Sequence, residues 1–318
     1  MNSEQEQLAK AFSDQPVDLY GASELRAQLE TTLANNPPDA APVAPDLLAD
    51  AASQAGAEIL GTSWEVAREA QRAIARLFNE ILPDSDLMAP ELSDFVKAGV
   101  EFSRLQESFE AMEVAGFKPE LILAPIDLTL ESWKTIYASL RQWQDQNHPN
   151  SDFKLKSQSD GDGLYVYSGV ANAWDDLARH AAEATPGARV EGPLGITWKA
   201  LVVPTASKAE GGLIVNTSHD LNEGRDKLRL QIGGEAQTIT PEAAHMPIGA
   251  YLTLQAEHVY RDEPLLDSDT WTWNAGTFDS GSRAPASYWR SGNGQVDVNY
   301  DLVGSSDDRI GARLPVWG

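Results

Sequence analysis

The tripeptide Ser218-His219-Asp220 contains the three residue types of a hydrolase triad. A triad needs its side chains to converge on one point, whereas neighbouring side chains in a strand or turn point apart. No Gly-x-Ser-x-Gly nucleophile motif accompanies the tripeptide. We therefore predict a surface turn at these residues rather than a catalytic centre.

Metal-binding patterns are incomplete in this sequence. Asp160-Gly-Asp-Gly163 begins like a calcium loop, but Leu164 and Ala171 stand where that loop needs oxygen ligands. None of the five histidines has the spacing of a zinc motif, and the absence of cysteine excludes disulfides, thiolate sites and cysteine nucleophiles. Glycine-rich nucleotide-binding motifs are absent as well. The sequence predicts a turn at Asp160–Gly163 and no cofactor.

Carboxylates and tryptophans could together serve a glycan-active enzyme, because glycoside hydrolysis uses two acidic residues. Nothing in the sequence selects such a pair among 48 acidic side chains, and the tryptophans fall at apolar positions of periodic segments. We expect a protein that is not an enzyme, with a glycan-active enzyme as an alternative.

The stretch Thr270–Gly318 has the clearest pattern in the chain. From Gln295 to Leu302 polar and apolar residues alternate, which is typical of a strand with one buried and one wet face. Val296, Val298, Tyr300 and Leu302 are expected in the core. The candidate ligand-binding residues are the polar side chains of the wet face and of the loop before it: Tyr288, Ser291, Asn293, Gln295, Asp297, Asn299 and Asp301.

The same stretch has aromatic and basic residues that we expect to be structural. Trp271, Trp289 and Trp317 stand where an apolar anchor is needed, and Arg313 can hold a loop or a carboxylate. Small, polar and tyrosine residues on such a rigid frame resemble the composition of antigen-binding loops. A recognition surface is therefore our first hypothesis.

The rest of the chain divides into three regions. Residues 1–45 read as a flexible arm ending in a proline-rich linker, and residues 46–116 as a helical region with helices over 64–82 and 91–115. Residues 117–318 mix short strands with helices, including a helix capped by Thr129. The fold class that follows is α+β.

Three motifs near the C-terminus occur in a characteristic order: Trp271-Thr-Trp273, Ser282-Arg-Ala-Pro285 and Ile310-Gly-Ala-Arg313. In this order they resemble the C-type-lectin-fold variable proteins of diversity-generating retroelements, which are related to the formylglycine-generating enzymes. The resemblance covers about fifty residues and implies a C-type-lectin-like domain over 117–318 that binds ligands through a variable surface. The sugar-binding triplets of calcium-dependent lectins and the cysteines of the enzymes are missing, so neither activity is implied.

The net charge of −24 argues against nucleic acid as a partner, because phosphate contacts need a basic face. No apolar run is long enough to span a membrane, and the start of the chain lacks the order of a secretory signal. The sequence predicts a cytoplasmic protein that binds an unknown protein or glycan, with homo-oligomerisation through the helical region left open. A phage or particle assembly component with the same fold is the structural alternative.

Overall fold

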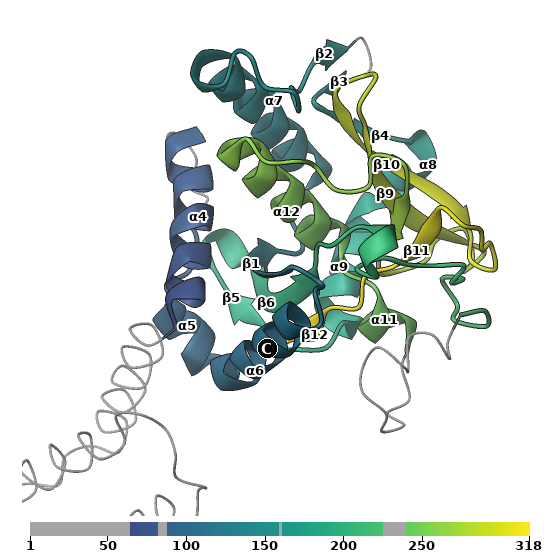
Figure 1. Cartoon of the computed structure of the whole chain (residues 1–318), viewed down its shortest axis with the longest axis horizontal. Coiled ribbons are helices and arrows are strands. Elements are labelled where there is room, and N and C mark those ends of the chain that lie inside the picture. Colours follow the sequence, from purple (N-terminus) through teal and green to yellow (C-terminus); the bar gives the residue numbers. More distant parts are fainter. Residues whose placement is uncertain (1–63, 82–87, 159–160, 225–239) are drawn as a thin grey trace, which may run out of the picture. The chain divides into compact units, whose positions relative to one another are not determined.

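The computed structural model describes residues 64–81, 88–158, 161–224 and 240–318 (Figure 1). They belong to a compact unit, Gly56–Gly318, that mixes helices and sheets, which confirms the α+β class. The arm and linker predicted for 1–45 lie outside the described residues. Ser63, which the sequence predicts as the N-cap of the helix over 64–82, also lies outside them.

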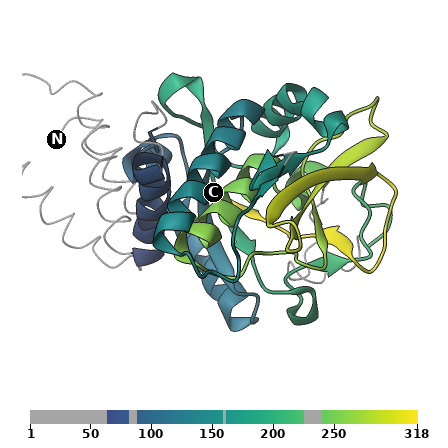
Figure 2. The ribbon, with the colours of Figure 1, turned by 90° about the horizontal axis from the view of Figure 1, so that it is seen from above.

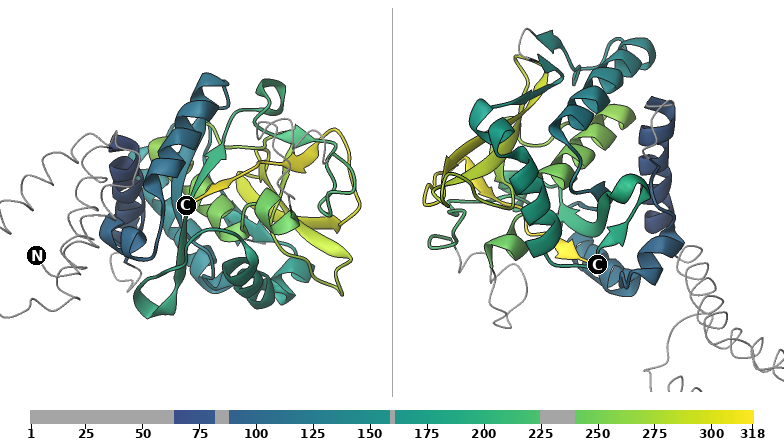
Figure 3. Two further views of the ribbon diagram at one scale, coloured as in Figure 1. Left: turned by 90° about the horizontal axis from the view of Figure 1, so that it is seen from below. Right: turned by 180° about the vertical axis from the view of Figure 1, so that it is seen from behind.

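Helices supply one side of the unit and its centre. The helices are α4 (Glu65–Ile81), α5 (Leu92–Lys97), α6 (Phe102–Val114), α7 (Leu130–Asn147), α8 (Ser168–Asn172), α9 (Trp174–Ala184), α11 (Pro241–Ala244) and α12 (Ile248–Arg261), with short 3-10 turns at Pro193–Gly195 and Lys208–Glu210. In Figures 1 to 3, α4 lies on the side opposite the strands β9 (Arg283–Arg290) and β10 (Gln295–Leu302), and α12 runs between α4 and these strands.

The helical region packs on a sheet instead of forming a bundle of its own. The helix predicted over 91–115 is two helices, α5 and α6, because the chain turns at Gly99 with a φ of 94°. Ile74 of α4, Phe95 of α5 and Leu105 of α6 belong to the same buried cluster as the first strand of the four-stranded sheet. One core therefore serves the helices and the sheet.

The four-stranded sheet has β6 at its centre. Its strands are β1 (Pro119–Pro125), β5 (Val190–Glu191), β6 (Thr197–Pro204) and β12 (Val316–Trp317), and every partner of β6 is antiparallel to it. All eight residues of β6 are buried, as expected for a strand covered on both faces.

The six-stranded sheet has the order β4-β10-β9-β8-β11-β7. Its strands are β4 (Leu164–Val166), β7 (Ile214–Val215), β8 (Trp271–Trp273), β9 (Arg283–Arg290), β10 (Gln295–Leu302) and β11 (Ile310–Ala312), and a small hairpin of β2 (Ser157–Gln158) and β3 (Gly161–Asp162) stands beside it. The predicted bounds of β10 are confirmed. The sequence of Ile310–Trp317 predicts one closing strand, and this prediction is wrong: β11 joins this sheet and β12 (Val316–Trp317) joins the other.

Two local predictions illustrate what fixes the helices. Thr129 caps α7, with its Oγ1 accepting a hydrogen bond from Ser132 N at 3.1 Å. The segment Leu252–Tyr260, which fits helix or strand from its sequence, lies within α12, where twelve consecutive residues from Ile248 to Val259 are buried. Burial on all sides removes the periodic signal that identifies a helix.

Candidate functional site

A row of side chains crosses four strands on the outer face of the six-stranded sheet. Asp297 of β10 stands in register with Tyr165 of β4 and with Tyr288 of β9. The register of β8 and β9 continues the row to Trp271, whose ring stacks on that of Tyr288 with centroids 4.4 Å apart and planes at 9°. Paired residues share a face of a sheet. The strands therefore bring together side chains that are distant in the sequence: Tyr165 and Asp297 are direct neighbours although they are 132 positions apart.

Arg290 ties this row together. Its Nη2 lies 2.8 Å from Asp297 Oδ2 and donates hydrogen bonds to the hydroxyls of Tyr288 at 2.5 Å and Tyr167 at 3.3 Å. The Tyr288 hydroxyl donates to Asp297 Oδ2 at 3.0 Å, and burial raises the pKa of Tyr288 to about 12. This hydroxyl therefore stays protonated at neutral pH and acts as a donor and an acceptor within the network.

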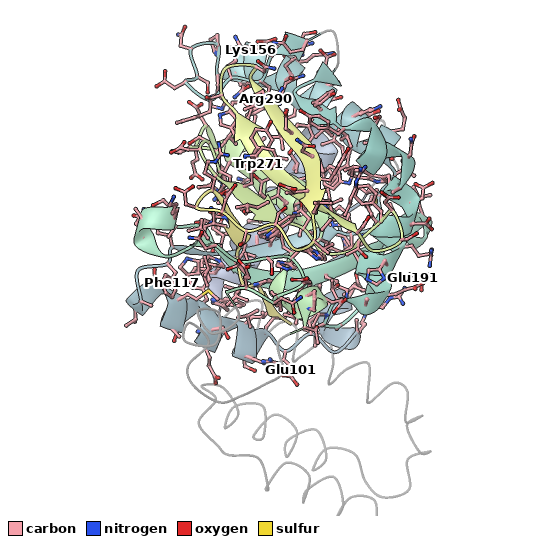
Figure 4. All side chains as sticks on the ribbon, turned by 90° about the vertical axis from the view of Figure 1, so that its right-hand side faces the viewer. Glu101, Phe117, Lys156, Glu191, Trp271 and Arg290 are labelled. Carbon is pink, nitrogen blue, oxygen red and sulfur yellow. The ribbon has the colours of Figure 1, made fainter. Side chains whose placement is uncertain are left out.

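We call the six residues of this surface the aromatic face: Tyr165, Tyr167, Trp271, Tyr288, Arg290 and Asp297. Figure 4 looks onto it, with Arg290 and Trp271 labelled over the front strands. Val296 and Trp289 point to the opposite side of the sheet and are buried in the main core. The backbone beneath the face is therefore held by packed side chains.

The structure corrects the prediction that Gln295 and Asp297 are exposed. Both are fully buried, although they lie on the expected face of β10. The side chains of Tyr288 and Arg290 contact Asp297, and the β2–β3 hairpin holds Gln295, whose Nε2 donates to Gly161 O at 3.0 Å. Alternation identifies the face of a residue, but large neighbours decide whether it reaches water.

The other predicted site residues differ in their surroundings. Ser291 is exposed at the β9–β10 turn, while Tyr288 and Asn293 are half-buried. Asn299 is half-buried and follows Asp297 on the same face. Asp301 shapes the end of β10, because its Oδ1 accepts hydrogen bonds from Leu302 N at 2.7 Å and Ser305 Oγ at 2.9 Å.

Two residues predicted for the core lie at its margin. Tyr300 is half-buried against Phe278, with ring centroids 5.4 Å apart, and Leu302 is 58% exposed. β10 extends past the packed interior at this end, so its last apolar residues have little to pack against.

Four members of the aromatic face were not among the predicted ligand-binding residues: Tyr165, Tyr167, Trp271 and Arg290. The alternation of Tyr165-Val166-Tyr167 was a signal for two of them, but their pairing with β10 is parallel and distant in sequence. Trp271 was expected to be structural and is half-buried, whereas Trp289 and Trp317 are buried.

Ser218, His219 and Asp220 do not form a triad. His219 Nε2 bonds to the carbonyl of Asn274 at 3.0 Å, while Ser218 Oγ donates to Asp220 Oδ1 at 2.7 Å. The predicted turn is present, but the prediction that it lies at the surface is wrong, because Ser218 and His219 are buried. His245 stacks on His219 with centroids 4.5 Å apart.

Burial lowers the pKa of both stacked histidines. The pKa of His219 falls to about 4, and that of His245 lies well below its usual range because of burial and the neighbouring His219. His245 Nε2 lies 3.0 Å from the carbonyl of His219, while its Nδ1 has no hydrogen-bond partner within the described residues. The pair is therefore a neutral, buried element rather than a general base at a solvent-filled site.

A buried ion pair connects the segments that border the aromatic face. Arg313 Nη2 lies 2.7 Å from Asp267 Oδ1, and its Nη1 donates to the carbonyls of Pro204 and Ala206. Thr272 of β8 donates to the other oxygen of Asp267 at 2.7 Å. The prediction that Arg313 holds a carboxylate is confirmed, and the pair joins the end of β6 to β8.

A second charged cluster lies where α12 meets β1. Glu120 Oε1 is 2.8 Å from His258 Nε2 and its Oε2 is 2.6 Å from Arg261 Nη2. Burial acts to raise the pKa of Glu120, but these two partners outweigh it and lower the pKa to about 2. Glu120 is therefore a fixed negative charge at neutral pH.

Glu257, on the same helix, has the opposite character. Burial raises the pKa of Glu257 to about 8; Arg261 acts against this, and the carboxylates of Glu120 and Glu263 add to it. Its Oε1 has no hydrogen-bond partner within the described residues. Glu257 is therefore a buried and largely neutral carboxylic acid at pH 7, and burying it lowers the stability of the fold. The sequence pattern did not identify it.

A cavity of about 220 Å³ opens beside α9 and shares no residue with the aromatic face. Charged side chains of both signs line it, among them Asp127, Asp175, Arg179 and Arg189. Within the part of the chain that the structure describes, no three His, Cys, Asp or Glu side chains gather closely enough to hold a metal ion. None of the described helices is long and apolar enough to cross a membrane.

Comparisons with known proteins find no relative of this chain. No protein-family model matches it, and no match was found among curated proteins or among solved structures.

Proposed function

We propose that this chain is a ligand-binding protein and that the aromatic face is its recognition surface. The observation that carries the proposal is the row of Tyr165, Asp297, Tyr288 and Trp271 across four strands, tied together by Arg290. Tryptophan, tyrosine and arginine are enriched among the few residues that dominate the binding energy of protein interfaces. Large side chains held in one conformation also lose little entropy on binding.

The resemblance to the variable proteins of diversity-generating retroelements supports the same assignment. Its three motifs lie on adjacent strands: Trp271–Trp273 forms β8, Arg283 begins β9 and Ile310–Ala312 forms β11. In this proposal the exposed or half-buried positions Ser291, Asn293 and Asn299 are those that vary. The packed network of Arg290 and Asp297 keeps the surface in place while they do.

The proposed protein is not an enzyme, acts in the cytoplasm and binds neither nucleic acid nor a cofactor. The net charge of −24 supports the absence of a nucleic-acid partner. Self-association through the helical region is part of the prediction. An assembly component with the same fold would use the aromatic face for a fixed partner instead of a variable one.

Two displayed libraries test the proposal. One randomises Tyr165, Ser291, Asn293 and Asn299, and the matched control randomises four exposed positions of α7: Glu131, Lys134, Gln142 and Gln146. Both are sorted for protease resistance and then for binding to lysozyme and serum albumin. We expect both libraries to fold and the first to yield binders at several-fold higher frequency. Equal frequencies, or a first library that does not fold, would contradict the proposed function.

A further inference from the structure

The cavity beside α9 is lined by three segments that are distant in the sequence. Asp127 follows β1, Arg189 precedes β5, and Asp175, Ala178 and Ala182 lie along α9. Ala178 and Ala182 are one helical turn apart and share a side of the helix. Their small side chains leave room between the charged groups.

The four-stranded sheet keeps Asp127 and Arg189 apart. On β6, Trp198 pairs with Pro125 of β1 on one side and with Val190 of β5 on the other. Adjacent strands lie about 4.8 Å apart, so the backbones that lead to Asp127 and to Arg189 are separated by roughly 10 Å. The two opposite charges therefore lie on either side of β6.

Three charged groups of the cavity are available to a ligand. Within the described residues, neither Arg189 nor Asp175 forms an ion pair or a hydrogen bond. Asp127 Oδ1 accepts a backbone hydrogen bond at the start of β6 at 2.7 Å, and its Oδ2 accepts none from the same part of the chain. Arg179 differs, because its Nη2 lies 2.8 Å from Asp176 Oδ1.

A second cation lies beside Arg189. Lys199 of β6 donates from its Nζ to the carbonyl of Pro186 at 3.0 Å, where the chain has just left α9. Burial and the neighbouring Arg189 lower the pKa of Lys199 to about 8, so this group is mostly protonated at pH 7. The end of the cavity near β5 is therefore positive.

The start of α9 brings negative charge to the other end. Trp174 Nε1 donates to the carbonyl of Leu128 at 2.9 Å. This contact places Asp175, the next residue of α9, at the end of the cavity where Asp127 lies. The cavity is therefore negative at one end and positive at the other.

We propose that this cavity binds a small zwitterion with one carboxylate and one ammonium group, as amino acids have. The carboxylate pairs with the Arg189 guanidinium, whose planar fork suits two parallel hydrogen bonds. The ammonium group lies between Asp127 and Asp175. The volume of about 220 Å³ is below the roughly 300–1,000 Å³ of pockets for drug-sized ligands, so the ligand has few carbon atoms.

Titrations of the full chain, followed by amide NMR shifts, test the proposal with two zwitterions. L-alanine has both charged groups on one carbon atom, and γ-aminobutyrate has them further apart. Butyrate and propylamine are the ligand controls, because each keeps only one of the two charged groups. We expect at least one zwitterion to shift amides of α9 and β5 saturably, and both ligand controls to bind about tenfold or more weakly.

Three variants make the same comparison on the protein. Arg189→Gln and Asp175→Asn each remove one charge of the cavity, and Arg309→Gln is the control, because Arg309 is exposed and does not line the cavity. Urea unfolding checks that each variant folds. We expect the two cavity variants to bind the zwitterion about tenfold or more weakly and the control to bind it as the parent chain does.

Several outcomes would overturn the proposal. Butyrate or propylamine binding as tightly as the zwitterion would make the cavity a site for a simple anion or cation. Unchanged binding in Arg189→Gln and Asp175→Asn would place the ligand elsewhere, and no saturable shift with either zwitterion would leave the cavity without the proposed ligand. If a cavity variant does not fold, the ligand controls on the parent chain still decide. The aromatic face shares no residue with the cavity, so the proposed function does not depend on these results.

Discussion

At the scale of single residues, Arg313 and Asp267 depend on each other for their charge balance. Both side chains are buried, and each satisfies the charge of the other while also bonding to Thr272. Replacing one partner leaves the other charged in the interior, which costs more than the pair itself contributes.

We expect Arg313→Met to lower the free energy of unfolding by about 3–5 kcal/mol, the cost of leaving a buried charge unpaired. Urea denaturation at pH 7 measures it. Arg309→Gln is the control, because Arg309 is exposed and its contact with Asp307 at 3.8 Å is weak; we expect a change below about 0.5 kcal/mol. Equal effects of the two substitutions would show that the buried pair contributes nothing specific.

Glu257 predicts a decrease in stability toward alkaline pH. Its pKa is about 8 in the folded chain, against 4.5 for an ordinary glutamate. The folded state therefore binds more protons between these values, and stability falls as pH rises from 4.5 to 8. Glu257→Gln stays neutral throughout. The free energy of unfolding of Glu257→Gln, relative to that of the parent chain, should therefore rise by on the order of 3 kcal/mol between pH 4.5 and 7, at about 1.4 kcal/mol per pH unit. An advantage that is constant with pH would contradict this.

For the stacked histidines we expect the opposite dependence of stability on pH, in the acidic range. The pKa of His219 is about 4 in the folded chain and 6.5 in the unfolded reference, so the unfolded state binds the extra proton. Stability is complete above pH 6.5 and is lost as pH falls toward 4. In the Glu257→Gln background, we expect His219 to cost roughly 2 kcal/mol between pH 7 and 5. His219→Asn should remove that loss, and exposed His180→Asn should not.

At the scale of elements, local signals predicted single helices and strands well. Thr129 supplies the side-chain cap of α7, and strict alternation gave the bounds of β10. What they could not give was the partner of each strand. Tyr165 and Asp297 meet through a parallel pairing, and no local pattern encodes which distant strand lies alongside. The aromatic face depends on that pairing, so only its β9 and β10 parts could be predicted.

The break between α5 and α6 shows that one residue can end a helix although the helical spacing of apolar residues continues beyond it. Gly99 has a φ of 94°, and a Cβ at this position would meet no atom within 4 Å. We expect Gly99→Ala to destabilise the protein by about 1 kcal/mol through backbone strain alone. Gly304→Ala is the control, because its space is equally open and its φ is not positive. Thermal unfolding of both variants measures the difference, and equal melting temperatures would refute the strain argument.

At the scale of the whole molecule, the acidic charge and the recognition surface are separate features. The net charge argued against a nucleic-acid partner, whereas the neutrality of the aromatic face follows from the Arg290–Asp297 ion pair. Net charge is a sum over the surface and contains no information about which charges cancel locally. The residues of the proposed binding surface are therefore identified by the fold and not by the composition.

The division of the C-terminal segment between two sheets has a consequence for biosynthesis. β11 pairs with β8 in one sheet, and β12 pairs with β6 in the other, with Arg313 buried between them. The six-stranded sheet lacks β11 until Ala312 has left the ribosome, and the four-stranded sheet lacks β12 until Trp317 has. The strands made earlier have unpaired edges until then, and folding intermediates with unpaired strand edges are prone to aggregate. Until β12 has been made, the nascent chain is therefore expected to expose unpaired strand edges, and chaperones that shield such edges are expected to lower its aggregation.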